Sequence, residues 1–157
     1  MTESPARVLP RPADTVEPFR TADRVHFDEL DPMGILHNAR YQIHVERAVS
    51  AFYRLHGLDT PPGELGGSDR FHAVRRFEID FELPFREEGP LRVELWLDHL
   101  GRTSMRYGFA CLGSADEVHA TGARTVVRID PVDFRPREWS TGWREAHLNG
   151  LRIERSF

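Results

Sequence analysis

The sequence contains no lysine and only one cysteine, and both facts exclude familiar kinds of chemistry. All 21 basic residues are arginine, so a lysine Schiff base, a lysine general base and the lysine-containing Walker phosphate loop are ruled out. The single thiol, Cys111, excludes an internal disulfide framework and a zinc cluster built from cysteines. Because Cys111 lies in an apolar strand pattern, we expect a buried structural residue rather than a nucleophile.

Long apolar runs and a basic excess are also absent. No run approaches the roughly 20 apolar residues that a membrane-spanning helix requires. Residues 1–19 hold four prolines and mixed charges where a signal peptide would have an apolar stretch. We therefore expect a cytoplasmic protein with no membrane partner, in which residues 1–19 form a mobile leader. The formal net charge of −4 argues against broad nucleic-acid binding, which requires a basic face.

The hydrophobic period changes once along the chain. Residues 20–30 alternate as a strand, residues 31–36 read as a turn, and a helix is predicted from Asn38 to Gly57. An exposed loop is expected over 60–68. After it, a two-residue period predicts further strands over 71–83, 91–97, 105–111 and 118–129.

One strand, one long helix and a run of consecutive strands predict an α+β fold. We expect an antiparallel five-stranded sheet wrapped around one long central helix, because such a sheet must bury one face against another element. This domain is predicted over residues 20–137, and residues 138–157 are predicted as a C-terminal extension with a short helix at 141–148. No internal repeat or second domain is apparent in the sequence.

The stretch from Phe27 to Glu46 places a carboxylate, Asp31, just before the start of the predicted helix. A helix start offers unpaired backbone N–H groups and positive dipole character. A carboxylate facing those donors can attack a carbonyl, or direct water at it, while the donors hold the carbonyl oxygen. The pattern therefore favours acyl-transfer chemistry. A purely structural role is the alternative, since Asp is common in turns and Asn38 could simply cap the helix.

The residues Asp31, Gly34, Asn38 and Tyr41, with the turn at 100–104 and the order of strands, resemble the signature of hotdog-fold acyl thioesterases of the 4-hydroxybenzoyl-CoA thioesterase-like family. The resemblance covers about residues 20–137. It implies hydrolysis of an acyl-CoA or acyl-carrier-protein thioester to a free acid and a thiol. It also implies a homo-oligomer, a dimer or a tetramer of hotdog dimers, and no cofactor beyond the coenzyme A moiety of the substrate.

Roles for individual residues follow from the resemblance and, for His37 and Gly34, from their positions; His37 could equally be an ordinary turn histidine. Asp31 is the nucleophile or general base, and the backbone N–H of Asn38 polarises the carbonyl. His37 is the nearest imidazole and could assist proton transfer. Glu46 corresponds to the helix carboxylate that one branch of these enzymes uses, and Gly34 permits close backbone approach. The proposed substrate contacts are Tyr41, otherwise expected in the core, Arg76 and Arg102 for the phosphates, and Thr103 and Ser104 for the pantetheine channel.

Two other functions stay open on the sequence alone. One is a non-catalytic hotdog module that binds acyl-CoA, and the other is a hotdog dehydratase, which is disfavoured because the helix lacks a convincing histidine-plus-acid signature. The histidines show no ligand spacing, so we predict no metal site. The acyl group is not determined, because the aromatic residues that could line its pocket could equally fill the core: Phe52, Phe77, Phe81, Trp96 and Phe109.

Overall fold

The computed structural model describes residues 17–60 and 68–151, so most of the predicted leader, most of the loop at 60–68 and the end of the C-terminal extension lie outside the described residues. One antiparallel sheet has the strand order β1-β3-β4-β5-β2. Its strands are β1 (Phe19–Val25), β2 (His72–Phe81), β3 (Gly89–Leu100), β4 (Ser104–Leu112) and β5 (Val118–Arg128). The helices are α1 (Tyr41–Leu55) and α2 (Thr141–Gly150), with short 3₁₀ turns η1 (Phe27–Glu29) and η2 (Asn38–Arg40).

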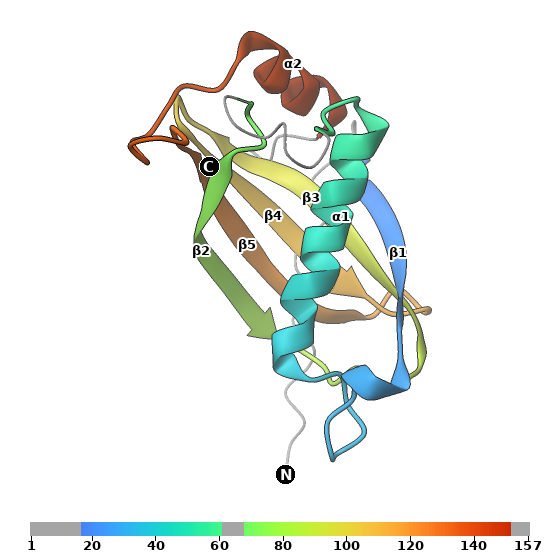
Figure 1. The fold of residues 1–157 in the computed structure, drawn as a ribbon. Helices are drawn as coiled ribbons and strands as arrows, with labels where there is room; N and C mark the ends of the chain where they lie inside the picture. Colours follow the sequence, from blue (N-terminus) through green and yellow to red (C-terminus); the bar gives the residue numbers. More distant parts are fainter. Residues whose placement is uncertain (1–16, 61–67, 152–157) are drawn as a thin grey trace.

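The long helix α1 crosses one face of the sheet, and this arrangement confirms the predicted five-stranded architecture (Figure 1). Val45, Ala48 and Phe52 follow one another at helical spacing and are all fully buried. On the sheet, alternate residues of β3 from Leu91 to Leu97 are buried. The apolar face of α1 and the apolar face of the middle strands therefore pack together in one core.

Two predicted boundaries near the start of α1 are wrong. The strand expected over 20–30 ends at Val25, because the Glu29 carboxylate accepts the backbone N–H of His26 at 2.8 Å and closes the 3₁₀ turn η1. The helix expected from Asn38 begins as the 3₁₀ turn η2, and α1 itself starts at Tyr41. Both differences arise from local bonds between side chains and backbone that hydrophobic periodicity does not encode.

The described part of the C-terminal extension packs on the core at the far end of α1 (Figure 1). Trp139 and Trp143 are buried and stacked, with ring centroids 5.7 Å apart, and Trp143 also contacts Tyr53 of α1. His147 is fully buried; its Nδ1–H donates to the Trp143 carbonyl at 2.7 Å, and its Nε2 accepts the Tyr107 hydroxyl at 2.8 Å. Burial lowers the pKa of His147 to about 4, which keeps the ring neutral.

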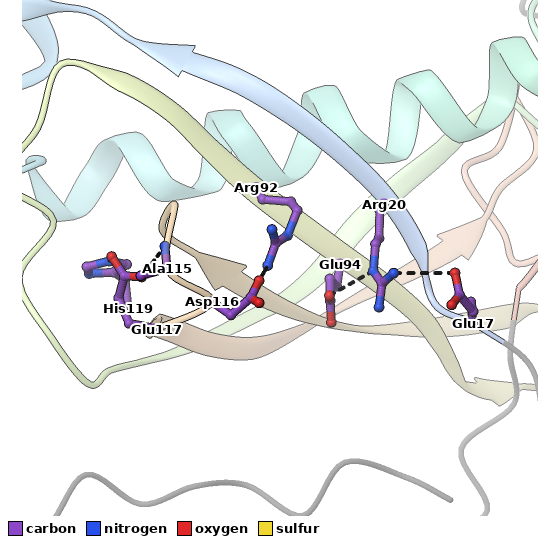
Figure 2. Close-up of polar contacts among 8 residues, drawn as sticks. All are labelled: Glu17, Arg20, Arg92, Glu94, Ala115, Asp116, Glu117 and His119. Carbon is purple, nitrogen blue, oxygen red and sulfur yellow. Dashed lines mark hydrogen bonds and ion pairs between the residues drawn. The ribbon is translucent and has the colours of Figure 1, made fainter. Parts of the chain in front are cut away.

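The face of the sheet opposite α1 carries ion pairs that connect neighbouring strands. Figure 2 shows Arg20 of β1 donating to Glu94 of β3 at 2.9 Å, and Arg92 of β3 paired with Asp116 in the turn after β4. Such partly exposed pairs contribute little stability individually. The thiol of Cys111 is buried as predicted, and burial raises its pKa to about 12. Within the described ranges, no helix has the length and apolar character needed to cross a membrane.

Candidate active site

Asp31 opens a tight turn whose backbone holds its carboxylate. Asp31 Oδ1 accepts the N–H groups of Met33 at 2.8 Å and Ile35 at 3.3 Å, and the Asp31 N–H donates to the Ile35 carbonyl at 2.8 Å. Gly34 has a φ of +74°, a left-handed conformation that glycine adopts without steric cost. Among the described residues only Oδ1 is engaged, so Oδ2 is available to a reacting group.

The base of this turn is bonded to two other parts of the chain. Leu30 and Leu36 form an isolated β-bridge, and the His37 N–H donates to the Glu29 carbonyl at 2.9 Å. The Leu36 N–H donates to the Phe85 carbonyl at 2.8 Å, which ties the turn to the connection between β2 and β3. The position of Asp31 therefore depends on η1 on one side and on the β2–β3 connection on the other.

The start of the helix lies directly after the turn. His37 is the N-cap of η2, the 3₁₀ turn that leads into α1, because His37 Nδ1 accepts the Ala39 N–H at 3.1 Å. Within residues 17–60 and 68–151, the backbone N–H of Asn38 donates no hydrogen bond. This donor and the positive end of the helix are available to an oxygen atom that carries developing negative charge.

A cleft of about 420 Å³ joins the turn and the helix start. Asp31, His37, Asn38 and Glu82 are the polar residues of its lining, and the apolar residues of its wall come from the turn and from the end of β2 with the segment after it. The side chains of Phe81 and Leu83 in that wall are 51% and 39% exposed. The full lining consists of Asp31, Met33, Ile35, Leu36, His37, Asn38, Tyr41, Phe81, Glu82, Leu83 and Pro84. The cleft can therefore receive an apolar group beside a carboxylate and a free N–H donor.

His119 of β5 hydrogen-bonds to the segment that forms the wall of the cleft. Its Nδ1–H donates to the Leu83 carbonyl at 3.2 Å, and its own carbonyl accepts the Glu82 N–H at 2.9 Å. On the other side, Nε2 lies 3.1 Å from the Glu117 carboxylate; Figure 2 draws both residues. The pKa of Glu117 is lowered, first by a hydrogen bond from the Glu117 backbone N–H and then by one from His119. These contacts fix the apolar wall relative to the sheet.

Tyr41 and Glu46 lie on α1 but differ in their relation to the cleft. Tyr41 is 2% exposed, lies at the cleft, and packs edge-on against Phe81 at 5.3 Å. Burial raises the pKa of Tyr41 to about 12, so its hydroxyl stays neutral. Glu46 is further along the helix and does not line the cleft; its carboxylate accepts from Arg124 of β5 at 3.4 Å.

The predicted phosphate and pantetheine contacts do not gather around Asp31 within one chain. Arg76 on β2 is 67% exposed and pairs with Glu78 at 2.8 Å. Arg102 is 80% exposed, pairs with Glu138 at 3.3 Å, and lies with Thr103 and Ser104 where β3 connects to β4. That connection is beside α2, and the whole length of β3 separates it from the Asp31 turn (Figure 1).

Sequence reasoning missed two parts of this region. Leu83 and Pro84 reach the cleft through the β2–β3 connection, and only long-range folding brings them there. The second part is His44, which contacts two carboxylates beneath the turn. Its signal is a polar residue on the buried stripe of the helix, between Tyr41 and Val45. In the part of the chain that the structure describes, no group of three or more His, Cys, Asp or Glu residues could hold a metal ion.

Comparisons with known proteins agree with this geometry. The family model of the thioesterase superfamily matches residues 33–110. The chain is 23% identical over 119 residues to the acyl-CoA thioester hydrolase YbgC of Escherichia coli, covering 76% of this chain and 87% of that protein. A 1,4-dihydroxy-2-naphthoyl-CoA thioesterase from Synechocystis superposes with a TM-score of 0.76 at 14% identity, covering 83% of this chain and 96% of that one. A Thermus thermophilus thioesterase complexed with coenzyme A and Zn gives a TM-score of 0.68 at 26% identity, with coverages of 83% and 98%.

The structural matches define the class of protein, which is a hotdog fold with one helix against an antiparallel sheet. The sequence matches then indicate the family. They point to the thioesterase superfamily and to thioester hydrolases.

Proposed function

We propose that this protein hydrolyses an acyl-CoA, or an acyl group on a carrier protein, to a free acid and a thiol in the cleft beside Asp31. The observation that carries the proposal is the shared cleft, in which the Asp31 carboxylate and the Asn38 N–H meet one apolar wall. The match to the thioesterase superfamily model supports the reaction class. The name of the Escherichia coli relative supports coenzyme A as the thiol part of the substrate.

The proposed chemistry uses two features of the site. Asp31 either attacks the thioester carbonyl to give a mixed anhydride or takes a proton from a water molecule that attacks it. The carbonyl oxygen gains charge in both routes and is stabilised by the Asn38 N–H and the positive end of the helix. The carbon–sulfur bond then breaks, and the sulfur leaves as a thiolate that takes up the proton released from water. In the first route a water molecule afterwards hydrolyses the mixed anhydride, which releases the free acid and regenerates the Asp31 carboxylate. Losing one such donor typically lowers the rate by about 10²–10³.

Other predicted residues take supporting roles in this proposal. Gly34 shapes the turn that presents Asp31, and His37 keeps its Nε2 for proton transfer while its Nδ1 caps the helix. Tyr41 forms part of the cleft lining. Glu46 has no direct role in the proposed reaction, because its carboxylate pairs with Arg124. We propose no cofactor beyond the coenzyme A moiety.

We further propose a homo-oligomer, a dimer or a tetramer of hotdog dimers. β2 is an edge strand, and its Val74 and Phe81 are 43% and 51% exposed. Exposed apolar side chains along an edge strand favour a covering partner. Arg102, Thr103 and Ser104 lie at the far end of the sheet from Asp31, so contact with the same coenzyme A would require them to come from another copy.

The Asp31→Asn variant tests the central residue. Asparagine keeps an oxygen that accepts the Met33 and Ile35 N–H groups, so we expect the fold and melting temperature to persist. Thiol release should fall by about 10²–10⁴, the usual contribution of such a group. The measurement is thiol release from short-chain, long-chain and aromatic acyl-CoAs. Asp28→Asn, an exposed acid in η1, is the matched control and should retain wild-type turnover.

The outcomes separate the proposed enzyme from a binding module. Full turnover in Asp31→Asn would remove Asp31 from the mechanism. Binding of acyl-CoA by the wild type without thiol release from any acyl-CoA or acyl-carrier-protein substrate would identify the non-catalytic module instead.

Treatment with a chelator tests the proposal that no metal takes part. The reaction as written needs one carboxylate and backbone N–H donors, so we expect thiol release to stay unchanged after dialysis against EDTA. A loss of activity that Zn²⁺ or Mg²⁺ restores would contradict it. The control is the melting temperature before and after dialysis, which separates catalysis from folding.

A further inference from the structure

A buried group of charged side chains joins β1, η1 and α1 beneath the Asp31 turn. His44 of α1 is fully buried. Its Nδ1 lies 2.8 Å from Asp23 Oδ2 of β1, and its Nε2 lies 2.9 Å from Glu29 Oε1 of η1. Both ring nitrogens of one imidazole therefore face carboxylate oxygens from different elements.

Each carboxylate also has a second donor. Arg47 Nη1 donates to Asp23 Oδ2 at 2.7 Å, and Glu29 Oε2 accepts the His26 backbone N–H at 2.8 Å. Partial burial by itself would raise the pKa of Asp23. The hydrogen bond from Arg47 and the positive charges of His44 and Arg47 outweigh it, and the pKa is lowered. Asp23 is accordingly ionised.

Both contacts of His44 are satisfied when each ring nitrogen carries a proton. A neutral imidazole has one N–H donor and one lone pair, so it could satisfy only one of the two carboxylates. The other nitrogen would then point its lone pair at a carboxylate oxygen within 3 Å, which is repulsive. With both nitrogens protonated, the buried His44 carries a charge opposite to that of the buried Glu29, and the more exposed Arg47 pairs with Asp23.

The contact with Glu29 reaches the Asp31 turn directly. The Glu29 carbonyl accepts the His37 N–H at 2.9 Å, and the adjacent Leu30–Leu36 bridge closes the turn that carries Asp31. His44 is on α1, which follows directly on the 3₁₀ turn η2 that presents the Asn38 N–H. One side chain therefore links the segment that carries the proposed nucleophile to the helix that carries the proposed donor.

We propose that His44, as an imidazolium ion bridging Asp23 and Glu29, is a positioning residue that fixes the Asp31 turn relative to the start of α1. Its link to catalysis rests on the proposed thioesterase mechanism. A misplacement of about 1 Å between reacting groups can lower a rate about 10²-fold, so a fixed distance between Asp31 and Asn38 has a direct kinetic value.

Hydrogen exchange tests the positioning role without reference to activity. His44→Phe keeps a ring of similar shape and removes both bonds, and His147→Phe is the matched control, since His147 is equally buried and doubly bonded at the opposite end of the fold. We expect amide exchange over residues 28–37 to accelerate about tenfold or more in His44→Phe, because the segment opens locally. The same segment should exchange at the wild-type rate in His147→Phe. Equal exchange over 28–37 in wild type and His44→Phe overturns the proposal.

Glu29→Gln is the second variant, and it decides the question should His44→Phe fail to fold. Because glutamine is neutral, Glu29→Gln leaves less uncompensated charge in the group than His44→Phe does. It should accelerate exchange over the same segment, and a wild-type rate there overturns the proposal. Proton–nitrogen NMR of the imidazole rings at neutral pH supplies an independent signature. We expect two N–H groups on His44, and a single one would overturn the imidazolium bridge.

Thiol release then tests the link to catalysis. In His44→Phe and Glu29→Gln we expect kcat to fall about 10²-fold with KM within about threefold, since the substrate still binds but the reacting groups are misplaced. His147→Phe should keep the wild-type kcat. A wild-type kcat in both His44→Phe and Glu29→Gln would overturn the kinetic role. Absence of thiol release in the wild type would instead refute the proposed function, while exchange and NMR would still decide on His44.

Discussion

The Asp31 carboxylate is held by backbone N–H groups, and this choice of partners matters for its chemistry. A cation paired with the carboxylate would have competed with the substrate carbonyl for it. Here Met33 and Ile35 engage one oxygen from within the same turn, and the second oxygen is left to the cleft. The turn also requires one residue in the left-handed region, and Gly34 occupies that position.

Gly34→Ala should destabilise the protein without creating a clash. No atom lies within 4 Å of where its Cβ would be, so the cost comes from the φ of +74° alone. We expect the free energy of unfolding to fall by about 1–2 kcal/mol, the usual penalty for a left-handed L-residue. Urea unfolding measures it. Gly142→Ala in α2, also in open space but with ordinary φ, is the control and should raise the free energy by up to about 1 kcal/mol. Equal effects at both positions would contradict this explanation.

Among the elements, α1 and the strands of the core were predictable because each buries a continuous face. The residues Val45 and Phe52 repeat at helical spacing, and Leu91 and Leu97 lie at the ends of an alternating run. The bond from His26 to Glu29 that ends β1 early is a local contact without a periodic signal. Element type therefore followed from the sequence, and exact boundaries did not.

The candidate site divides in the same way. Asp31 and Asn38 are close in sequence, so their proximity could be predicted from one turn and one helix start. Leu83 joins them only because the β2–β3 connection is bonded to Leu36 and His119 across the fold, and no short-range pattern encodes those contacts. Arg102 was assigned by resemblance alone and lies at the far end of β3.

The contact between α2 and the core should make stability depend on pH. Burial depresses the pKa of His147 from its ordinary value of 6.5 to about 4, so as pH falls below 6.5 the unfolded chain binds a proton before the folded one does. Unfolding is favoured progressively between these values, by about 3 kcal/mol in total. Urea unfolding between pH 7 and 4 measures the slope. In His147→Phe, which cannot titrate, the slope should be shallower, and an unchanged slope would assign the effect to other groups.

Across the whole molecule, the two edges of the sheet are unlike. β1 pairs its polar side chains with β3, as Arg20 does with Glu94. β2 exposes apolar side chains such as Val74, which shares the α1 face because it pairs with the buried Val126. This asymmetry favours the β2 side as the surface that a second copy covers.

Val74→Asp should weaken the proposed oligomer, because a charge would then be buried without a partner at the interface. By light scattering, we expect the wild type to have the mass of a dimer or tetramer of the 18.1 kDa chain, and Val74→Asp to shift toward monomer with reduced thiol release. Ala22→Asp, an exposed position on the opposite edge strand β1, is the control and should keep the wild-type mass. A monomeric wild type would refute the oligomer.

The stacked indoles of Trp139 and Trp143 have an optical consequence. The remaining tryptophan, Trp96, donates to Asp98 on the outer side of β3, and none of the three lines the cleft. Parallel rings 5.7 Å apart couple their transitions, so the near-ultraviolet circular dichroism of this protein should carry a signal that vanishes when α2 detaches. Two of the three tryptophans therefore report on the α2 end of the fold, and following substrate in the cleft requires a tryptophan introduced there or a labelled acyl chain.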